Sequence, residues 1–387
     1  MHTPLLVFAD DWGRHPSSCQ HLVRHLLGRH EVVWVNTIGT RTPRLNGATL
    51  KRGLEKMRLW AKKRAAAPEL PTNLRVVNPK MWPWFGSRFS RRLNRGLLTR
   101  QLAPLLRGFS TPPIAVSTLP IVSDLVGTLA VQHWVYYCVD DFSLWPGLDQ
   151  ATLLEMDEDL IHKADSIVAV SETLQMRLAK SGRESRLLTH GVDLDFWCKP
   201  AEIQGPKAWD GLERPLIVFW GLIDRRMDVA TVRQLACDLK KGTILLVGPQ
   251  ADPDPILLKL PRVVHLSPIA FDHLPLLAKA ASVLIMPYAD LPVTRAMQPL
   301  KLKEYLATGR PVVASDLPAN RSWFDSLDLA STPEAFSKAV LERLVTGLPD
   351  AQGQARDRLT GESWSEKARL FEQWIHAEEP SRNGDCQ

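Results

Sequence analysis

A loop, a helix and a strand are predicted in succession within residues 296–315, in a segment that could bind phosphate. Pro299 stands at a plausible first helical position, and Gly309 lies just after the predicted helix end. Lys301 adds a positive charge, and Glu304, about one turn further on, could accept hydrogen bonds from a ribose diol. A merely capped helix with a surface glutamate is the alternative. Free backbone N–H groups and the positive end of the helix dipole would attract a diphosphate beside Gln298, Pro299 and Leu300.

Asp140 and Asp141 follow a predicted buried strand at Trp134–Val139, at the end where α/β sheets place their ligands. Two adjacent carboxylates could accept a proton from a hydroxyl or orient a sugar, because a neighbouring like charge raises the pKa of one of them. Helix capping or a structural Asx turn is the alternative for this pair.

Apolar runs that alternate with helical patterns must position these residues. Such alternation predicts parallel sheets with helices on both faces. The alternation breaks at Asp195–Pro215, where Pro and Gly gather as in a linker. The predicted strands are Leu5–Ala9, Val32–Asn36, Leu74–Val77, Ile114–Ser117, Trp134–Val139 and Ile167–Val170 before the break, and Leu216–Trp220, Thr243–Val247, Val263–Leu266, Val283–Met286 and Pro311–Ser315 after it.

We therefore predict an α/β protein with two doubly wound, Rossmann-like domains, at residues 1–197 and 213–350. A C-terminal helix within 355–378 is expected to cross back to the N-terminal domain. Its apolar face is formed by Trp364, Ala368, Phe371 and Ile375.

Composition narrows the class of protein. The 387 residues with 45% hydrophobic content suffice for two ordinary cores. No run reaches the roughly 18 apolar residues of a membrane span, and the N-terminus lacks a basic signal region, so we expect a cytoplasmic protein. Five scattered cysteines suggest neither a zinc site nor disulfides. A dehydrogenase is disfavoured because no Gly-x-Gly-x-x-Gly follows the first strand.

The segment 296–315 resembles the donor-binding motif of GT-B glycosyltransferases, especially retaining family 4 and the capsule and teichuronic-acid polymer transferases. The resemblance implies a GT-B fold, with two Rossmann-like domains that face a central cleft, and a nucleotide-sugar donor in that cleft. Family 4 enzymes usually carry a second glutamate eight residues before the position of Glu304, where this chain has Ala296. The matching residues are Pro299, Lys301, Glu304, Tyr305, Ala307, Gly309, Pro311, Val312 and Val313.

The segment from Gly221 to Asp228 resembles the family's glycine turn, where a basic residue reaches the donor phosphates. Arg226 is the first candidate for this residue and Arg225 the second. A planar guanidinium suits bidentate phosphate contact, and positive charge near a departing diphosphate lowers the barrier. Two exposed arginines that pair with Asp224 or Asp228 are the alternative.

Three further segments resemble parts of the family's site. The strand ends at 245–249 and 264–269 resemble the walls of the nucleotide pocket and imply donor contacts at Gly248, Pro249 and Ile269, although Gly248 could simply form a tight turn. The loop at 10–21 resembles the family's acceptor-facing loop and implies contacts at Gly13, Arg14 and His15. The loop at Asp140 and Asp141 resembles the Asp-Asp loop of the polymer transferases, near where many family 4 enzymes have a histidine.

Positive charge is concentrated near the N-terminus. Residues 1–110 hold 20 Lys and Arg against 5 Asp and Glu, whereas the rest holds 28 against 37. Within 51–107, cations are mixed with aromatic and apolar residues, which suits an anionic membrane surface at the inner face of the plasma membrane. A solvated helix is the alternative, and nucleic acid is a weaker third possibility because no nucleic-acid motif accompanies the charge.

The resemblance implies a glycosyltransferase that moves a sugar from a nucleotide-diphosphate-sugar to a hydroxyl of a glycan or lipid-linked acceptor, in cell-surface polysaccharide synthesis and with retention of configuration. The donor is a co-substrate, and we expect no cofactor or metal, because arginine and lysine can neutralise the diphosphate. The alternatives are a nucleotide-sugar epimerase of the same fold and a non-catalytic nucleotide-sugar-binding protein. The catalytic candidates are Asp140, Asp141, Arg226 and Lys301.

Overall fold

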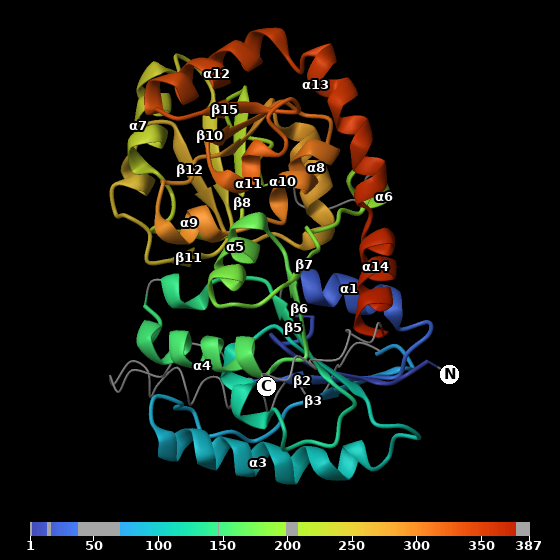
Figure 1. Ribbon diagram of the computed structural model, residues 1–387. Coiled ribbons are helices and arrows are strands. Elements are labelled where there is room, and N and C mark those ends of the chain that lie inside the picture. Colours follow the sequence, from blue (N-terminus) through green and yellow to red (C-terminus); the bar gives the residue numbers. More distant parts are fainter. Residues whose placement is uncertain (1, 14–16, 38–69, 146, 199–207, 377–387) are drawn as a thin grey trace. The chain divides into compact units, whose positions relative to one another are not determined.

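A computed structural model of the chain describes residues 2–13, 17–37, 70–145, 147–198 and 208–376 (Figure 1). The contacts divide the chain into two compact units. The first unit consists of Met1–Thr189 together with Lys367–Gln387, and the second unit is His190–Glu366.

The first unit is built on a seven-stranded parallel sheet with the order β3-β2-β1-β4-β5-β6-β7. The order reverses between β1 and β4, as in doubly wound folds. β1 is buried along its whole length, as expected for a central parallel strand that is covered on both faces. The strands are β1 (Leu5–Ala9), β2 (Val32–Asn36), β3 (Leu74–Val77), β4 (Ile114–Ser117), β5 (Trp134–Cys138), β6 (Ser166–Ala169) and β7 (Arg186–Leu187).

The helices of the first unit begin at side chains that suit an N-cap. Ser17, Ser87, Asp149 and Ser171 each accept a hydrogen bond from a backbone N–H of the first turn. One core cluster joins α3, η2 and α4 to β1, β2, β4 and β5, so these three elements cover one face of the sheet. The helical elements are α1 (Ser18–Leu26), α3 (Arg88–Leu106), η2 (Pro120–Leu125), η3 (Phe142–Leu144), α4 (Gln150–Lys163) and α5 (Glu172–Lys180).

The last helix, α14 (Trp364–His376), enters the first unit at Lys367. Its Phe371 ring lies 5.5 Å from the ring of Tyr137 on β5. Glu372 lies 2.8 Å from Nε2 of the buried His30 and also pairs with Arg29. An aromatic contact, the contact of Glu372 with the buried His30 and the ion pair with the partly exposed Arg29 therefore fix this helix to the first unit.

The second unit contains a six-stranded parallel sheet with the order β12-β10-β8-β13-β14-β15. The order reverses between β8 and β13, so both units are Rossmann-like and the predicted fold class is confirmed. A small second sheet pairs β9 (Ile223–Asp224) with β11 (Gln250–Ala251). The main strands are β8 (Leu216–Trp220), β10 (Thr243–Val247), β12 (Val263–Leu266), β13 (Val283–Met286), β14 (Val312–Ser315) and β15 (Asp328–Ala330).

Helices alternate with the strands of this second sheet along the sequence. None of the helices in the described part of the chain combines the length and hydropathy needed to span a bilayer. The helical elements are α6 (Leu194–Cys198), α7 (Val229–Asp238), η4 (Leu257–Lys259), η5 (Phe271–His273), α8 (Leu274–Ala280), α9 (Pro292–Ala296), α10 (Lys301–Ala307), α11 (Pro318–Arg321), α12 (Pro333–Thr346), α13 (Asp350–Ala355) and η6 (Arg356–Glu362).

The two segments at the ends of the second unit are tied together. The backbone N–H of Val192 donates to the carbonyl of Glu362 at 2.9 Å, and that of Trp364 donates to the carbonyl of Val192 at 3.3 Å. The buried Lys303 of α10 donates to the carbonyl of His190 and to the carboxylate of Glu362. These contacts explain why residues 190–197, which the sequence pattern places in the first domain, belong to the second unit.

Lys303→Met is expected to lower the free energy of unfolding by about 2 kcal/mol, because the carbonyl of His190 and the partly buried Glu362 carboxylate lose their cationic donor. Urea unfolding followed by tryptophan fluorescence measures the change. Lys338→Met on the exposed side of α12 is the matched control. Equal unfolding midpoints for the two variants would contradict the assigned role.

Candidate functional site

The predicted donor residues of the second unit gather where its strand order reverses. The turn that begins at Gly221 follows β8, and the segment 287–300 follows the neighbouring β13. Ligands of open α/β sheets bind outside the carboxyl ends of the strands at this point. The sheet order alone therefore places both loops at the expected binding edge.

Two glycines bring the turns after β8 and β10 into direct contact. Gly221 and Gly248 have φ values of +138° and +146°, which side-chain-bearing residues rarely adopt. A Cβ atom on Gly248 would lie 2.0 Å from the carbonyl oxygen of Gly221. Gly248 therefore forms more than a tight turn, because its missing side chain lets the two backbones touch.

The ammonium group of Lys301 lies against the same glycine turn. A Cβ on Gly221 would stand 2.3 Å from Nζ of Lys301. Nζ donates to the hydroxyl of Tyr288 at 2.7 Å and lies 4.2 Å from the ring centroid of Phe219. The aromatic rings and the hydroxyl thus hold the cation at the carboxyl end of β8.

Arg226 is buried, with 6% of its surface exposed, and is held by Asp224. Its Nε lies 3.0 Å from both carboxylate oxygens of Asp224, and Nη2 lies 2.9 Å from Oδ2. Nη1 approaches the sulfur of Met297 at 3.2 Å, and the guanidinium lies 5.9 Å from the Tyr288 ring centroid. Arg226 therefore reaches the loop that precedes α10. The aspartate pairing considered as an alternative is present as well.

Arg225 points elsewhere. Its side chain is 53% exposed, and its Nε lies 3.4 Å from the carboxylate of the exposed Asp252. The structure brings Arg226, and not Arg225, together with Tyr288 and the loop before α10.

Glu304 lies on α10, one turn after Lys301, and is partly buried. Burial raises the pKa of its carboxyl group to about 7, against the opposing effects of the Lys301 charge and the Trp220 indole. Near neutral pH the group is therefore present in both protonation states and can donate as well as accept a hydrogen bond.

The helix of the predicted phosphate segment starts later than expected. α10 begins at Lys301 rather than near Pro299, because a separate helix, α9, ends at Ala296 and a link that starts with the extended Met297 follows. The carbonyl of Pro299 accepts only a turn-like hydrogen bond from Leu302, at 3.3 Å. The link contains the partly buried Gln298 and Leu300 and the buried Pro299. With seven residues the helix has a small dipole, so Lys301 must supply most of the positive charge.

Tyr305 joins α10 to the strand that carries the glycine turn. Its buried hydroxyl accepts a hydrogen bond from the backbone N–H of Trp220 at 2.9 Å. The two rings lie 4.2 Å apart. The tyrosine of the sequence motif therefore fixes the distance between Lys301 and the end of β8.

The residues predicted to line the nucleotide pocket follow β10 and β12. Pro249 is exposed, and its carbonyl accepts from the backbone N–H of Ile223 at 2.9 Å. Ile269 is partly buried against the core of the unit. His265 lies with Nε2 2.9 Å from the carbonyl of Gly248, which helps to hold the turn after β10.

In the first unit, Asp140 and Asp141 follow β5, and Asp141 is structurally engaged. Its carboxylate accepts hydrogen bonds from the N–H and hydroxyl of Ser143 and so caps η3. Arg177 lies 3.3 Å from the other carboxylate oxygen. The capping alternative therefore describes Asp141. Asp140 is partly buried beside it.

Arg177 also belongs to a buried network beneath this loop. It pairs with Asp157, which in turn accepts from the hydroxyl of Tyr136 on β5. Burial raises the pKa of Asp157, although the Arg177 charge opposes the effect. The network fixes the loop after β5 to helices α4 and α5.

The predicted acceptor loop is described only in part. Gly13 has a φ of +74°, and its N–H donates to the side-chain carbonyl of Gln20 at 3.0 Å. Arg14 and His15 lie outside the described residues.

The predicted site did not include Tyr288 or Arg177, and it named Asp224 only as an alternative partner of exposed arginines. The sequence could have identified Tyr288 as a site residue, because it follows the carboxyl end of a buried strand. No sequence pattern pointed to Arg177, because only the folded chain brings α5 beside the loop after β5.

Among the described residues, His2, His30 and Glu372 place ligand-type atoms within 4.8 Å of one another. Nδ1 of His30 is 2.7 Å from the carbonyl of Thr3, and Nε2 faces Glu372. The guanidinium of Arg29 is paired with the same carboxylate and disfavours a second cation there. We assign this cluster to the anchoring of α14.

Gly248→Ala is expected to destabilise the protein by about 3 kcal/mol, because the new methyl group meets a backbone carbonyl and φ is unfavourable for alanine. Thermal unfolding of the two proteins gives the difference. In Gly211→Ala the added methyl meets no atom within 4 Å, so this control should unfold like the wild type. A fully stable Gly248→Ala protein would refute the backbone contact.

The raised pKa of Glu304 predicts a pH dependence of stability. Between the ordinary value of 4.5 and about 7, the folded state keeps a proton that the unfolded state has released, so stability falls as pH rises through this window. Glu304→Gln should therefore be more stable than the wild type near pH 8, by about 2 kcal/mol, and nearly equal near pH 4. Melting temperatures across this range, with the exposed Glu334→Gln as control, test the sign. A wild-type advantage that grows with pH would contradict it.

Comparisons with known proteins agree with this geometry. Residues 214–346 match the family model described as glycosyl transferases group 1. TuaH of Bacillus subtilis strain 168, whose name assigns it to teichuronic acid biosynthesis as a glycosyltransferase, is 31% identical over 168 residues, which are 41% of this chain and 42% of TuaH. The match thus spans less than half of that relative.

Solved structures are similar over nearly the whole chain. Sucrose-phosphate synthase from Thermosynechococcus elongatus has a TM-score of 0.70 at 16% identity, covering 96% of this chain and 98% of its own. HepE from Anabaena, in complex with UDP and glucose, has a TM-score of 0.66 at 13% identity, covering 97% and 99%. These likenesses confirm the GT-B fold. The chain therefore has the GT-B fold, its residues 214–346 match the group 1 glycosyltransferase model, and it is a distant relative of TuaH.

Proposed function

We propose that the protein transfers a sugar from a UDP-sugar to a hydroxyl of a glycan or lipid-linked acceptor, in cell-surface polysaccharide synthesis. The position of the Lys301 ammonium against Gly221, at the point where the strand order reverses, carries the proposal. The UDP of the HepE complexes supports the choice of nucleotide, and the name of TuaH supports the choice of pathway.

Lys301 and Arg226 supply positive charge for the leaving diphosphate. The bond between the sugar C1 and the diphosphate oxygen breaks, and a bond from C1 to the acceptor oxygen forms. The proton of the acceptor hydroxyl passes to the departing diphosphate, and configuration is retained. Cations fixed before the reaction stabilise the developing charge without reorganisation. Asp224 keeps Arg226 in place, and Tyr288 contacts both cations.

Glu304 is proposed to bind the ribose diol, with donor contacts also at Gly221, Gly248, Pro249, Ile269 and the link 298–300. Of the two aspartates after β5, we propose that Asp140 serves the acceptor and that Asp141, which caps η3 and pairs with Arg177, holds the loop in place. We propose Arg225 only as a secondary contact to the nucleotide-sugar donor.

Nucleotide binding is expected to raise the melting temperature, because a ligand that binds only the folded state stabilises it. A thermal-shift screen of UDP-, GDP-, ADP- and dTDP-glucose should give the largest shift with the UDP-sugar. A larger shift with another nucleotide would correct the base while leaving the diphosphate site in place.

Removal of either site cation is expected to reduce transfer. Lys301→Met and Arg226→Met should each lower kcat/KM by about 100-fold or more, by analogy with the loss of a preorganised electrostatic contact. Arg225→Met is the matched comparison and should have the smaller effect, since this guanidinium pairs with Asp252. An effect of Arg225→Met equal to that of Arg226→Met would contradict the assignment.

Labelled donor with and without acceptor distinguishes transfer from other uses of this site. Product that forms only with an acceptor supports a transferase. Isomerised donor without acceptor would show an epimerase. Binding without any turnover would show a non-catalytic protein, for which the buried Ala296 in place of the family's second glutamate is the supporting feature.

A further inference from the structure

The first half of α3 presents an arginine-rich surface with exposed aromatic side chains. Arg88, Arg92 and Arg95 are exposed, and Phe89 is 75% and Trp82 is 42% exposed. α3 contains five arginines and no acidic residue. We name Trp82, Arg88, Phe89, Arg92 and Arg95 the α3 face.

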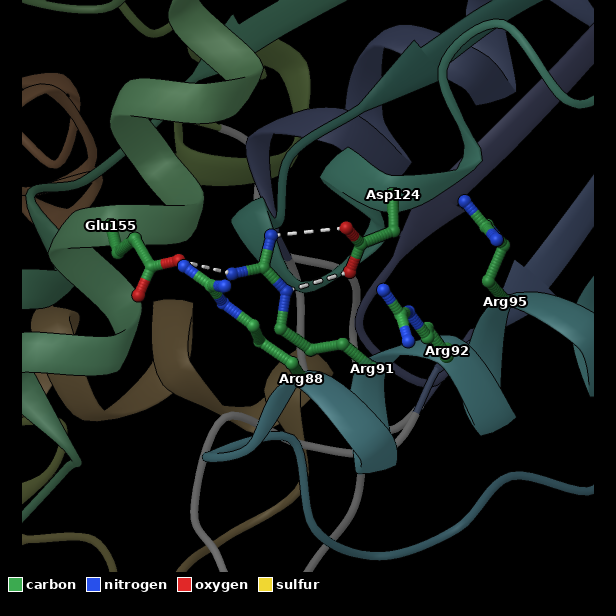
Figure 2. Close-up of a pocket in the computed structure, with 6 residues that line it drawn as sticks. All are labelled: Arg88, Arg91, Arg92, Arg95, Asp124 and Glu155. Carbon is green, nitrogen blue, oxygen red and sulfur yellow. Dashed lines mark hydrogen bonds and ion pairs between the residues drawn. The ribbon is translucent and has the colours of Figure 1, made fainter.

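Arg91 stands apart from the other arginines because carboxylates surround it. It forms a two-bond contact with Asp124 of η2, at 2.8 and 3.0 Å, and contacts Glu155 of α4 at 2.7 Å (Figure 2). Asp159, also on α4, lies 3.2 Å away. These ion pairs raise the pKa of Arg91 and fix α3 to η2 and α4. The acidic groups that border the hollow are thus already used by one arginine.

In the part of the chain that the structure describes, no carboxylate pairs with the remaining arginines of the hollow. Figure 2 shows the guanidinium groups of Arg88, Arg92 and Arg95 raised from α3 around the same hollow as Arg91. Within the described ranges of the chain, these three side chains make no hydrogen bond or ion pair. Three exposed cations on one helical face, beside a saturated fourth, form a surface for an anionic partner.

The placement of these arginines works against the stability of α3. Arg88 and Arg92 occupy the first turns, where the helix dipole is positive, and the first turn of α3 itself contains no acidic residue. Arg88 and Arg92 are also four residues apart and repel each other. An anion that binds from outside would relieve both effects.

The aromatic part of the α3 face is held rigidly beside the helix. Asn94 of α3 accepts a hydrogen bond from the N–H of Trp82 at 2.7 Å and donates to the carbonyls of Trp82 and Trp84 at 3.0 and 3.2 Å. The two indole rings lie 5.0 Å apart. Phe89 projects from the helix itself, so the exposed rings belong to ordered structure.

We propose that the α3 face docks on a membrane surface rich in anionic lipids. The arginines contact the headgroup phosphates, while Phe89 and Trp82 enter the boundary between headgroups and acyl chains. A lipid surface satisfies both features, since it offers phosphates for the guanidinium groups and an apolar layer for rings that water solvates poorly. The proposal does not depend on the reaction at the second unit.

Cosedimentation of the full chain with vesicles tests it. Binding to phosphatidylglycerol–phosphatidylcholine vesicles should exceed binding to pure phosphatidylcholine and should fall with salt. The triple variant Arg88→Gln, Arg92→Gln, Arg95→Gln should weaken partitioning by about 100-fold, which is the expected loss for three cations near an anionic surface. Phe89→Ser should weaken it by about 10-fold.

The control removes three exposed cations from the second unit through Arg233→Gln, Lys241→Gln and Lys338→Gln and should bind vesicles like the wild type. Circular dichroism and melting temperature confirm that all variants are folded. Equal weakening in the two triple variants, or no preference for anionic vesicles, would overturn the proposal. So would tighter binding to a duplex oligonucleotide that the α3 variant alone loses, which would assign the face to nucleic acid.

Discussion

The close contact among Gly221, Gly248 and the Lys301 ammonium is the constraint on which the candidate site depends. The two backbones can touch here only because Gly248 carries no side chain, and both glycines adopt φ values that favour glycine. The space that a side chain on Gly221 would fill is occupied by the cation of Lys301. The turns after β8 and β10 and the start of α10 are therefore fixed relative to one another by a single packing arrangement.

Helix α10 connects this arrangement to the ends of the second unit. Successive residues of a helix are about 100° apart, so Lys301 and Glu304 lie near one side while Lys303 points nearly opposite. Lys303 contacts the segments at His190 and Glu362, whereas Lys301 contacts the glycine turn. The short helix α10 thus contacts both the proposed diphosphate site and the segments where the chain passes from one unit to the other. A displacement of α10 would change the contacts at both places.

Much of this organisation is visible in the sequence, and the exceptions have physical reasons. Long buried strands such as β8 and β10 are recognisable because parallel strands covered on both faces are continuously apolar. β7 and β15 were not predicted, since two or three residues are too few for a pattern. The start of α10 was placed two residues early because Pro299 is typical of a first helical turn, whereas the chain uses it in a link after α9.

The sequence names the residue types of the proposed site but not the pairing of its side chains. Lys301, Arg226 and Glu304 were identified from the motif, and the structure brings Lys301 and Arg226 to one tyrosine, Tyr288. The pairing of Arg226 with Asp224 and the capping role of Asp141 depend on side-chain directions that spacing does not determine. The partial burial of Glu304, which shifts its pKa, likewise arises only from tertiary packing.

The central claim is that Lys301 neutralises a diphosphate, and calorimetric titration of UDP and of uridine into wild type and Lys301→Met tests it most directly. We expect the substitution to weaken UDP binding by about 100-fold, which corresponds to the loss of one charge-assisted contact of about 3 kcal/mol, while uridine binding stays unchanged. Equal losses for UDP and uridine, or no loss for either, would contradict the claim.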